Sequence, residues 1–285
     1  MARTKLVEDL QLDEYQDRFK EHFIMKRENG ILEIRMHTQG GEAKWGKELH
    51  RALPQIFQIA GADRKNEVII LTATGDYWLR EFDHESWEEI ETNEAVFAQA
   101  NYDFEYLDAH KLCENLLWNI DVPLISAING PGFHTEFALL CDITICADTT
   151  NLFEAHLGAG LVPGDGQFLV FQELLGLKRA NWYMFTREVI NAHQALDWGL
   201  VNEVLPKDSL MDRAWELAED LMKIERVTRR LTTAVTRRHW KKIFTDYFSH
   251  QMTSEMYAMM VDDLKTHQHS TQTVSEMADF LIKKQ

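Results

Sequence analysis

Two short apolar segments, each followed by a loop with glycines and titratable side chains, constrain the fold of this chain most. Residues 123–128 and 143–147 have the length and composition of strands that are buried on both faces. The first segment leads into the loop NGPGFHTE (129–136), and the second leads into EAH (154–156) and VPGDG (162–166). Loops at strand ends are where α/β proteins commonly keep their chemistry. We therefore expect the functional site where these loops meet.

The acidic composition of the chain narrows the classes of partner. The net charge of −16 is spread along the sequence, which argues against nucleic acid and anionic membranes as partners. No apolar run approaches the roughly 20 residues of a membrane-spanning helix, and the first residues are polar and acidic, unlike a signal peptide. Cys113, Cys141 and Cys146 show no metal-binding spacing, which indicates free thiols of a reducing compartment. We expect a cytoplasmic protein.

Periodicity predicts an alternation of strands and helices. The dipeptide Asn29-Gly30 is a two-residue turn signal between apolar runs at 23–27 and 31–37, and it predicts a hairpin. Apolar side chains then recur every four residues, as in an amphipathic helix, at Trp45, Leu49, Leu53 and Phe57. From Leu210 onward the pattern is helical. This order fits a twisted parallel sheet packed by helices, with a helical lobe at the C-terminus.

The strings VPLISAINGP, CDITICAD and VPGDG resemble the crotonase superfamily, the enoyl-CoA hydratase and isomerase clan. The likeness continues through LGLKRA and ALDWGLVNEV and covers the chain from about residue 20 onward. It implies an α/β fold, a crotonase-like spiral of ββα units with a twisted parallel sheet and a helical C-terminal lobe. We accordingly divide the chain into an N-terminal arm (1–20), a core (21–205) and a helical lobe for oligomerisation and pocket closure (206–285). The resemblance also implies a homotrimer or a dimer of trimers.

This chain departs from the clan at both positions of its oxyanion hole. Most of those enzymes hold a thioester carbonyl between two backbone N–H groups, which needs glycines for close approach. Here Glu81 stands where the motif F-x-A-G-x-D has its glycine. Phe133 and His134 replace the glycines before Glu136, in a shortened turn. We therefore do not expect an oxyanion hole made of two amides.

A histidine and an aspartate occupy the second catalytic region of the clan. The other common glutamate falls seven residues before the Pro-Gly of the P-G-x-G turn, and counting back from Pro163 reaches His156; the turn itself carries Asp165. A His–Asp pair without a Ser or Cys nucleophile suggests a base that activates water. Each residue has another interpretation, because a histidine near a strand end is often structural and Asp165 could cap the helix that follows.

The constellation resembles one branch of the clan, the cofactor-independent carbon–carbon bond hydrolases typified by 6-oxocamphor hydrolase and bacterial β-diketone hydrolases. That branch has a tryptophan five residues before a histidine, a histidine two before the loop glutamate, a histidine nine before the aspartate, and a glutamate in the last long helix. Six residues match these features: Trp45, His50, His134, His156, Asp165 and Glu255.

The resemblance implies retro-Claisen cleavage of a 1,3-diketone to a keto acid, with no metal or organic cofactor. His156, oriented by Asp165, would be the base. The indole N–H of Trp45 and the imidazole of His134 would stabilise the oxyanion in place of the missing amides. The other two residues have auxiliary roles: His50 would support Trp45 or the second substrate oxygen, and Glu255 would assist the enolate or the later proton transfer.

Other interpretations of these residues stay open at this point. Core packing would explain Trp45, and a surface position would explain His50 or Glu255. Two other functions are also open. One is a CoA-thioester hydratase or isomerase that uses Glu136 as its acid or base, and the other is a crotonase-fold binding protein without catalysis.

Overall fold

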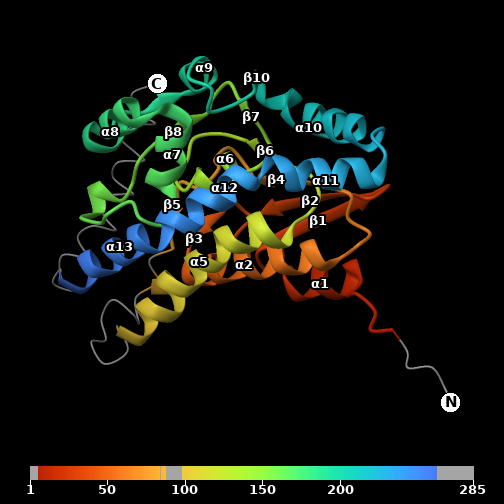
Figure 1. The fold of residues 1–285 in the computed structure, drawn as a ribbon, viewed down its shortest axis with the longest axis horizontal. Helices are drawn as coiled ribbons and strands as arrows, with labels where there is room; N and C mark the ends of the chain where they lie inside the picture. Colours follow the sequence, from red (N-terminus) through yellow and green to blue (C-terminus); the bar gives the residue numbers. More distant parts are fainter. Residues whose placement is uncertain (1–5, 84, 88–97, 262–285) are drawn as a thin grey trace.

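A six-stranded sheet forms the centre of the protein, as seen in the computed structural model, which describes residues 6–83, 85–87 and 98–261 (Figure 1). The spatial order of the strands is β1-β2-β4-β6-β7-β10. Their bounds are Phe23–Glu28 (β1), Ile31–Met36 (β2), Val68–Ala73 (β4), Leu124–Ile128 (β6), Ile143–Ala147 (β7) and Glu203–Leu205 (β10). Only the β1–β2 pair is antiparallel within this sheet. The predicted α/β class with a parallel sheet is confirmed.

The predicted hairpin at the start of the sheet is also confirmed. Asn29 and Gly30 connect β1 to β2, and both have a positive φ, 50° and 88°. Such a turn matches the twist of the two strands, and asparagine and glycine adopt it at the lowest steric cost. The strands predicted at 123–128 and 143–147 correspond to β6 and β7.

Helices cover the two faces of the sheet, which explains why its strands read as continuous apolar runs. On one face, α10 (Lys207–Met222) packs Leu210, Ala214 and Ala218 against Val68 and Ile70 of β4 and their neighbours on β6 and β7. The alternate residues of β4 face the larger core. That core includes α2 (Lys47–Ala62) and α5 (Leu107–Glu114), the latter flanked by η1 (Asn101–Tyr106) and η2 (Asn115–Asn119).

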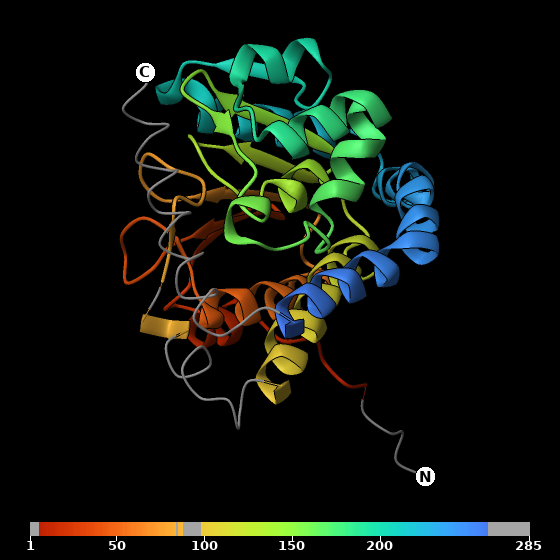
Figure 2. The ribbon, with the colours of Figure 1, turned by 90° about the vertical axis from the view of Figure 1, so that its left-hand side faces the viewer.

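The last described helices form one succession, whose later members run beside the η1–α5–η2 segment and bring the C-terminal part of the chain to the loops after the strands (Figures 1 and 2). They are α11 (Arg226–Thr236), α12 (Arg238–Ile243), η4 (Phe244–Phe248) and α13 (Ser249–Val261). Gly164 lies directly against α13, because a Cβ on this glycine would stand 2.2 Å from the carbonyl oxygen of Gln251. Only glycine permits this approach.

Short elements complete the fold. They are α1 (Leu12–Arg18), β3 (Lys44–Trp45), β5 (Glu81–Phe82), α6 (Glu136–Leu139), β8 (Asn151–Leu152), η3 (Leu157–Ala159), α7 (Gln167–Leu175), α8 (Leu177–Thr186), β9 (Ile190–Asn191) and α9 (Ala192–Asp197). Tyr15 of α1 and the adjoining Phe19 are buried in the main core, so this part of the predicted arm packs against the α/β unit. In the described ranges, no helix combines the length and the apolar composition needed to cross a membrane.

One sequence prediction about local structure is wrong. Trp45 lies outside the amphipathic helix, which begins at Lys47 after Gly46. It belongs instead to β3, where it pairs with Phe82 of β5 in a short parallel ladder. The four-residue spacing from Trp45 to Leu49 matched a helix, but the extended backbone of Gly46 ends the helical pattern before it reaches Trp45.

Candidate active site

The loop between β6 and α6 positions His134 through an unusual backbone conformation. His134 has a φ of 48°, a region that non-glycine residues seldom occupy. The neighbouring Trp78 holds this turn, because its indole Nε1–H donates to the carbonyl oxygen of His134 over 3.2 Å. The chain therefore keeps a glycine-like turn while placing an imidazole there. Strain of this kind persists where the surroundings fix it, and it is common at functional sites.

Asp165 lies between two imidazoles. Its Oδ2 is 3.0 Å from Nδ1 of His134 and 3.2 Å from Nε2 of His156. Its Oδ1 accepts the backbone N–H of Gln167, the first residue of α7, over 3.2 Å. Both interpretations of Asp165 therefore hold, since one carboxylate oxygen bonds to the start of a helix while the other joins the two rings.

Trp45 and His50 extend this cluster away from Asp165. The Trp45 indole stacks on the His134 ring with centroids 4.1 Å apart and an interplanar angle of 25°. His50, on α2, contacts the same indole edge-on at 4.9 Å. Both residues are only 4% exposed, so the proposed surface position of His50 is wrong. In the described part of the chain, Nδ1 of His50 has no hydrogen-bond partner.

Two further carboxyl groups complete the inner cluster. Glu255 of α13 is 4% exposed; its Oε2 accepts the backbone N–H of Gly164 over 3.0 Å and its Oε1 lies 3.9 Å from Nε2 of His156. Glu136 begins α6 and places Oε1 3.1 Å from Nδ1 of His134. Its Oε2 is buried without a partner in the described residues. All six predicted residues thus come together, and the solvated interpretation of Glu255 is wrong.

Burial and mutual charge determine how these groups titrate. Burial opposes charge on His134, but Glu136 and Asp165 raise its pKa from 6.5 to about 9. Burial likewise opposes charge on His156, whose pKa Asp165, Glu154 and Glu255 nevertheless hold well above 6.5. Although burial disfavours the anion of Asp165, the two imidazoles keep its pKa well below the usual range. These shifts favour a resting cluster in which an aspartate lies between two protonated imidazole rings.

Burial and the charges of the cluster also shift the pKa values of the surrounding groups towards their neutral forms. Burial and the charge of Asp165 raise the pKa of Glu255 well above 4.5, which favours its protonated form. Burial and the nearby His134 lower the pKa of His50 to about 3, which leaves this ring uncharged. Glu105 of η1 also lies in the field of the cluster, and burial is the main cause that raises its pKa to about 7.

Sequence reasoning missed three glutamates near this cluster. Glu136 was left out of the predicted catalytic set, and Glu105 and Glu154 received no role. Glu154 is completely buried, and its Oε1 lies 3.2 Å from Nδ1 of His156. A signal existed for Glu154, since it stands two residues before His156 in a loop next to a predicted core strand. For Glu105 no such neighbouring site residue exists in the sequence.

The amide-lined oxyanion hole expected of CoA enzymes is not formed at the loop before Glu136. The backbone N–H of Phe133 donates to the carbonyl oxygen of Leu79 over 3.0 Å and is therefore engaged within the protein. Glu81 is partly exposed on β5 and pairs with Lys44 across 3.2 Å. The side chains of Trp45 and His134 are the polar groups that occupy this region instead. The predicted departure from the clan thus has a structural basis.

His134, His156 and Asp165 are also residue types that transition metals bind, and their polar atoms lie within 4.8 Å of one another. Their arrangement favours protons instead. Both ring nitrogens are directed at one carboxylate oxygen at hydrogen-bond distance, and a ring protonated at that nitrogen offers no lone pair to an ion. The geometry supports an acid–base site.

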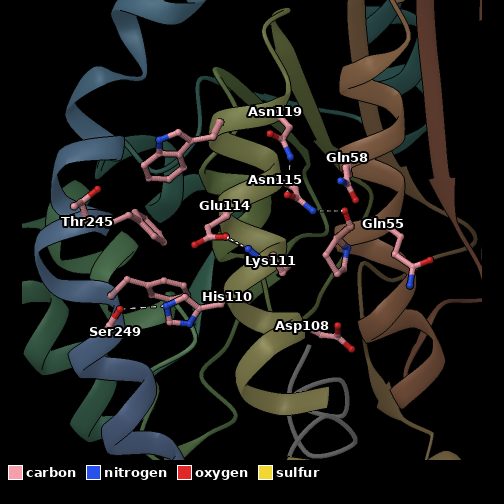
Figure 3. A pocket seen from close by; sticks show the side chains of 14 residues that line it. Gln55, Gln58, Asp108, His110, Lys111, Glu114, Asn115, Asn119, Thr245 and Ser249 are labelled. Atoms are coloured by element: carbon pink, nitrogen blue, oxygen red, sulfur yellow. Dashed lines mark hydrogen bonds and ion pairs between the residues drawn. The ribbon is translucent and has the colours of Figure 1, made fainter. Parts of the chain in front are cut away.

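A hollow of about 710 Å³ lies on the outer side of α5, between α2 and the η4–α13 segment (Figure 3). None of the six predicted residues lines it. Many of its polar side chains pair among themselves, as His110 does with Ser249 and Lys111 with Glu114. Phe244 and Phe248 form part of its wall and face Gly166, the residue after Asp165. The hollow therefore lies next to the loop that carries Asp165, but none of the six predicted residues faces it.

Comparison with known proteins adds independent information on the family. The enoyl-CoA hydratase/isomerase family matches residues 26–279. A β-diketone hydrolase from the cyanobacterium Anabaena sp. PCC 7120, solved with bound (S)-3-oxocyclohexyl acetic acid, is 35% identical to this chain. The alignment covers 87% of this chain and 98% of that one, with a TM-score of 0.80.

Curated relatives carry out different reactions. Carnitinyl-CoA dehydratase of Escherichia coli K12 is 29% identical over 205 residues, which cover 71% of this chain and 75% of the relative. The 4-chlorobenzoyl coenzyme A dehalogenase-1 of Arthrobacter sp is 26% identical over 203 residues, or 70% and 72% of the two chains. One fold thus supports several reactions, and the reaction has to be argued from the site. The chain itself belongs to the enoyl-CoA hydratase/isomerase family of the crotonase superfamily.

Proposed function

We propose that this protein is a carbon–carbon bond hydrolase that cleaves a 1,3-diketone to a keto acid without a cofactor. The observation that carries this proposal is the buried chain of contacts from Trp45 through His134 and Asp165 to His156. It supplies N–H donors and a proton acceptor where the clan uses backbone amides and glutamate. The bound ligand of the Anabaena hydrolase supports it, because a keto acid is the product class of this reaction.

The first step is the addition of water to one carbonyl carbon. The water oxygen bonds to that carbon, and one water proton passes to Nε2 of His156, where Asp165 stabilises the resulting imidazolium. The carbonyl electron pair moves onto oxygen. Because Nδ1 of His134 faces two carboxylates, its Nε2–H remains for this oxyanion, together with the indole N–H of Trp45.

The second step breaks the carbon–carbon bond. The oxyanion re-forms a carbonyl as the carboxylic acid, and the bonding pair leaves as the enolate of the other carbonyl. The enolate carbon then takes a proton from the imidazolium of His156 or from the carboxyl group of Glu255, which lies 3.9 Å from Nε2. Atoms balance, since one water enters and one keto acid leaves a cyclic diketone. The second carbonyl serves as the electron sink.

The resting protonation state predicts how this activity depends on pH. His134, Asp165 and His156 share protons and titrate as a unit, so the apparent pKa values belong to the cluster. The base form lacks one of the protons present at neutral pH. Activity is therefore expected to rise with pH above neutrality, as the cluster loses that proton.

The deciding experiment uses a panel of cyclic and linear 1,3-diketones without added cofactor. Loss of the ultraviolet absorbance of the enolised diketone, or gas chromatography of the keto acid, measures turnover. We expect the wild-type protein to cleave at least one member, and His156→Ala to lower kcat by about 10²–10⁴-fold, the usual contribution of a general base. Hydration of crotonyl-CoA together with silence on every diketone would contradict the proposal and favour the CoA-thioester function.

A further inference from the structure

Glu154 faces the side of His156 that lies away from Asp165. Its Oε1 is 3.2 Å from Nδ1, whereas Asp165 and Glu255 approach Nε2. Glu154 is completely buried. Its two carboxylate oxygens accept the backbone N–H groups of His156 and Leu157. These bonds fix the carboxylate beside the ring.

The two sides of the ring have different access to the reaction. Nε2 lies beside Asp165, whose other imidazole partner, His134, stacks on Trp45. Nδ1 is buried and has no hydrogen-bond partner in the described residues; Glu154 lies within ion-pair distance of it. A histidine acts as a base through one nitrogen only when the other keeps its proton, and that proton needs an acceptor. Asp165 cannot be this acceptor because it lies on the reactive side.

We propose that Glu154 is the positioning residue of the site, and that it holds a proton on Nδ1 of His156 so that Nε2 is the nitrogen that exchanges protons with water. The role assigned to Asp165 from the sequence changes accordingly. Asp165 stabilises the imidazolium after proton transfer, and Glu154 fixes the tautomer and the orientation of the ring. This inference rests on the proposed function where it concerns catalysis, but the tautomer is a property of the resting protein.

Several charged groups face His156 from the elements around it, and all of them act on its titration. Glu154 belongs to the same loop, Asp165 to the loop before α7, and Glu255 to α13. The ring of His134 meets that of His156 edge-on at 5.2 Å, and Glu105 of η1 is electrostatically coupled to it. Asp165 and Glu255, which lie on the Nε2 side, favour retention of a proton there. Glu154 is the group that opposes this preference from Nδ1.

The direct test is ¹⁵N NMR of histidine-labelled wild-type protein across alkaline pH. The signals of His156 are assigned by their loss in His156→Asn. We expect the neutral ring to carry its proton on Nδ1. A neutral ring protonated on Nε2, which is the usual tautomer of histidine in water, would overturn the proposal. This measurement needs neither a Glu154 variant nor a substrate.

The variant Glu154→Gln tests the effect on catalysis. Its amide oxygen can still accept backbone N–H groups, but it lacks the negative charge beside Nδ1. We expect the acid limb of the pH profile of kcat to move to lower pH by roughly 1 unit or more, because the loss of a negative charge this close to the ring lowers the pKa of His156. The alkaline plateau of kcat should fall by about 10²-fold or more because the tautomer is no longer fixed, while KM changes little.

A matched control removes a carboxylate beside a histidine on the surface. Glu173 pairs with Nε2 of the exposed His239, and Glu173→Gln should leave the His156 signals and the pH profile unchanged. An unchanged His156 titration in Glu154→Gln would refute the positioning role. If the wild-type protein cleaves no diketone, the proposed function fails, while the NMR result still decides the role of Glu154.

Discussion

Two buried clusters of charge, one around Arg237 and one around Asp165, differ in how completely their polar atoms are paired. Arg237 is 1% exposed, and its guanidinium donates to Asp142 and to the backbone carbonyl oxygens of Leu116, Ile120 and Val122. Every nitrogen of that guanidinium has an acceptor. In the cluster around Asp165, by contrast, Oε2 of Glu136 and Nδ1 of both His50 and His156 have no hydrogen-bond partner among the described residues.

The difference separates a structural cluster from a chemical one. An arginine cannot release its proton in a protein, so its charge must be fully compensated when it is buried. Imidazoles can release theirs, so the Asp165 cluster can exchange protons without leaving an isolated charge. Incomplete pairing, like charges and titratable partners are expected where a site performs acid–base work. Substitutions in the two clusters should therefore have opposite consequences.

The largest effect on activity is expected for Asp165→Asn. This change removes the anion shared by His134 and His156, and we expect kcat for diketone cleavage to fall by about 10⁴-fold, as for loss of a carboxylate from other catalytic histidines. Stability should change little, because both rings can lose their protons when the aspartate is absent. Steady-state kinetics and denaturant unfolding at pH 8 measure the two quantities. If Asp165→Asn were strongly destabilised, the Asp165 cluster would be a structural cluster like the one around Arg237.

Arg237→Met is the counterpart in the structural cluster. It leaves the Asp142 carboxylate without its partner, and loss of one member of a buried ion pair typically costs about 3–5 kcal/mol of unfolding free energy. The same denaturant experiment should detect this loss. The fraction that remains folded should keep normal activity per molecule, since Arg237 touches none of the groups around Asp165. Loss of kcat without loss of stability would show that the two clusters are coupled.

The sequence predicted the fold and the composition of the site better than its local geometry. Strands β6 and β7 and the hairpin at Asn29-Gly30 are found as expected, because apolar runs and turn dipeptides are local signals. The six residues that the family resemblance singled out lie together in the structure, and their catalytic roles stay predictions. The helical position of Trp45 was wrong because a spacing of four residues happened to continue across Gly46.

The role of Glu154 could not be read from spacing, because its significance depends on which ring nitrogen it faces. The backbone of the turn at His134 likewise depends on contacts with Trp78, which is distant in the sequence. Such features arise from tertiary packing rather than from local pattern. The predicted trimer and the domain boundaries stay predictions.

Trp45→Phe tests whether the indole N–H of Trp45 stabilises the oxyanion. Phenylalanine can keep the stack on His134 but lacks the indole N–H. We expect kcat to fall by about 10²–10³-fold, the usual effect of losing one oxyanion donor, with melting temperature nearly unchanged. Full activity in this variant would assign Trp45 to packing alone. Measuring kcat and KM separately distinguishes transition-state stabilisation from weaker substrate binding.

The smallest expected effect is a decrease in the unfolding free energy as pH rises. The titration of His134 causes this decrease, and the Arg237 cluster does not contribute to it. The pKa of His134 is about 9 in the folded protein against an ordinary value of 6.5, so the folded state binds more protons between these values. The stabilisation is fully present below pH 6.5 and is lost as pH rises through about 9. One such proton corresponds to at most about 1.4 kcal/mol per pH unit.

Unfolding free energies of the wild type from pH 6 to 10 should decline with this slope. The decline should be shallower in Asp165→Asn, because the carboxylate that raises both imidazole pKa values is gone, and equal slopes in the two proteins would place the titrating charge outside this cluster.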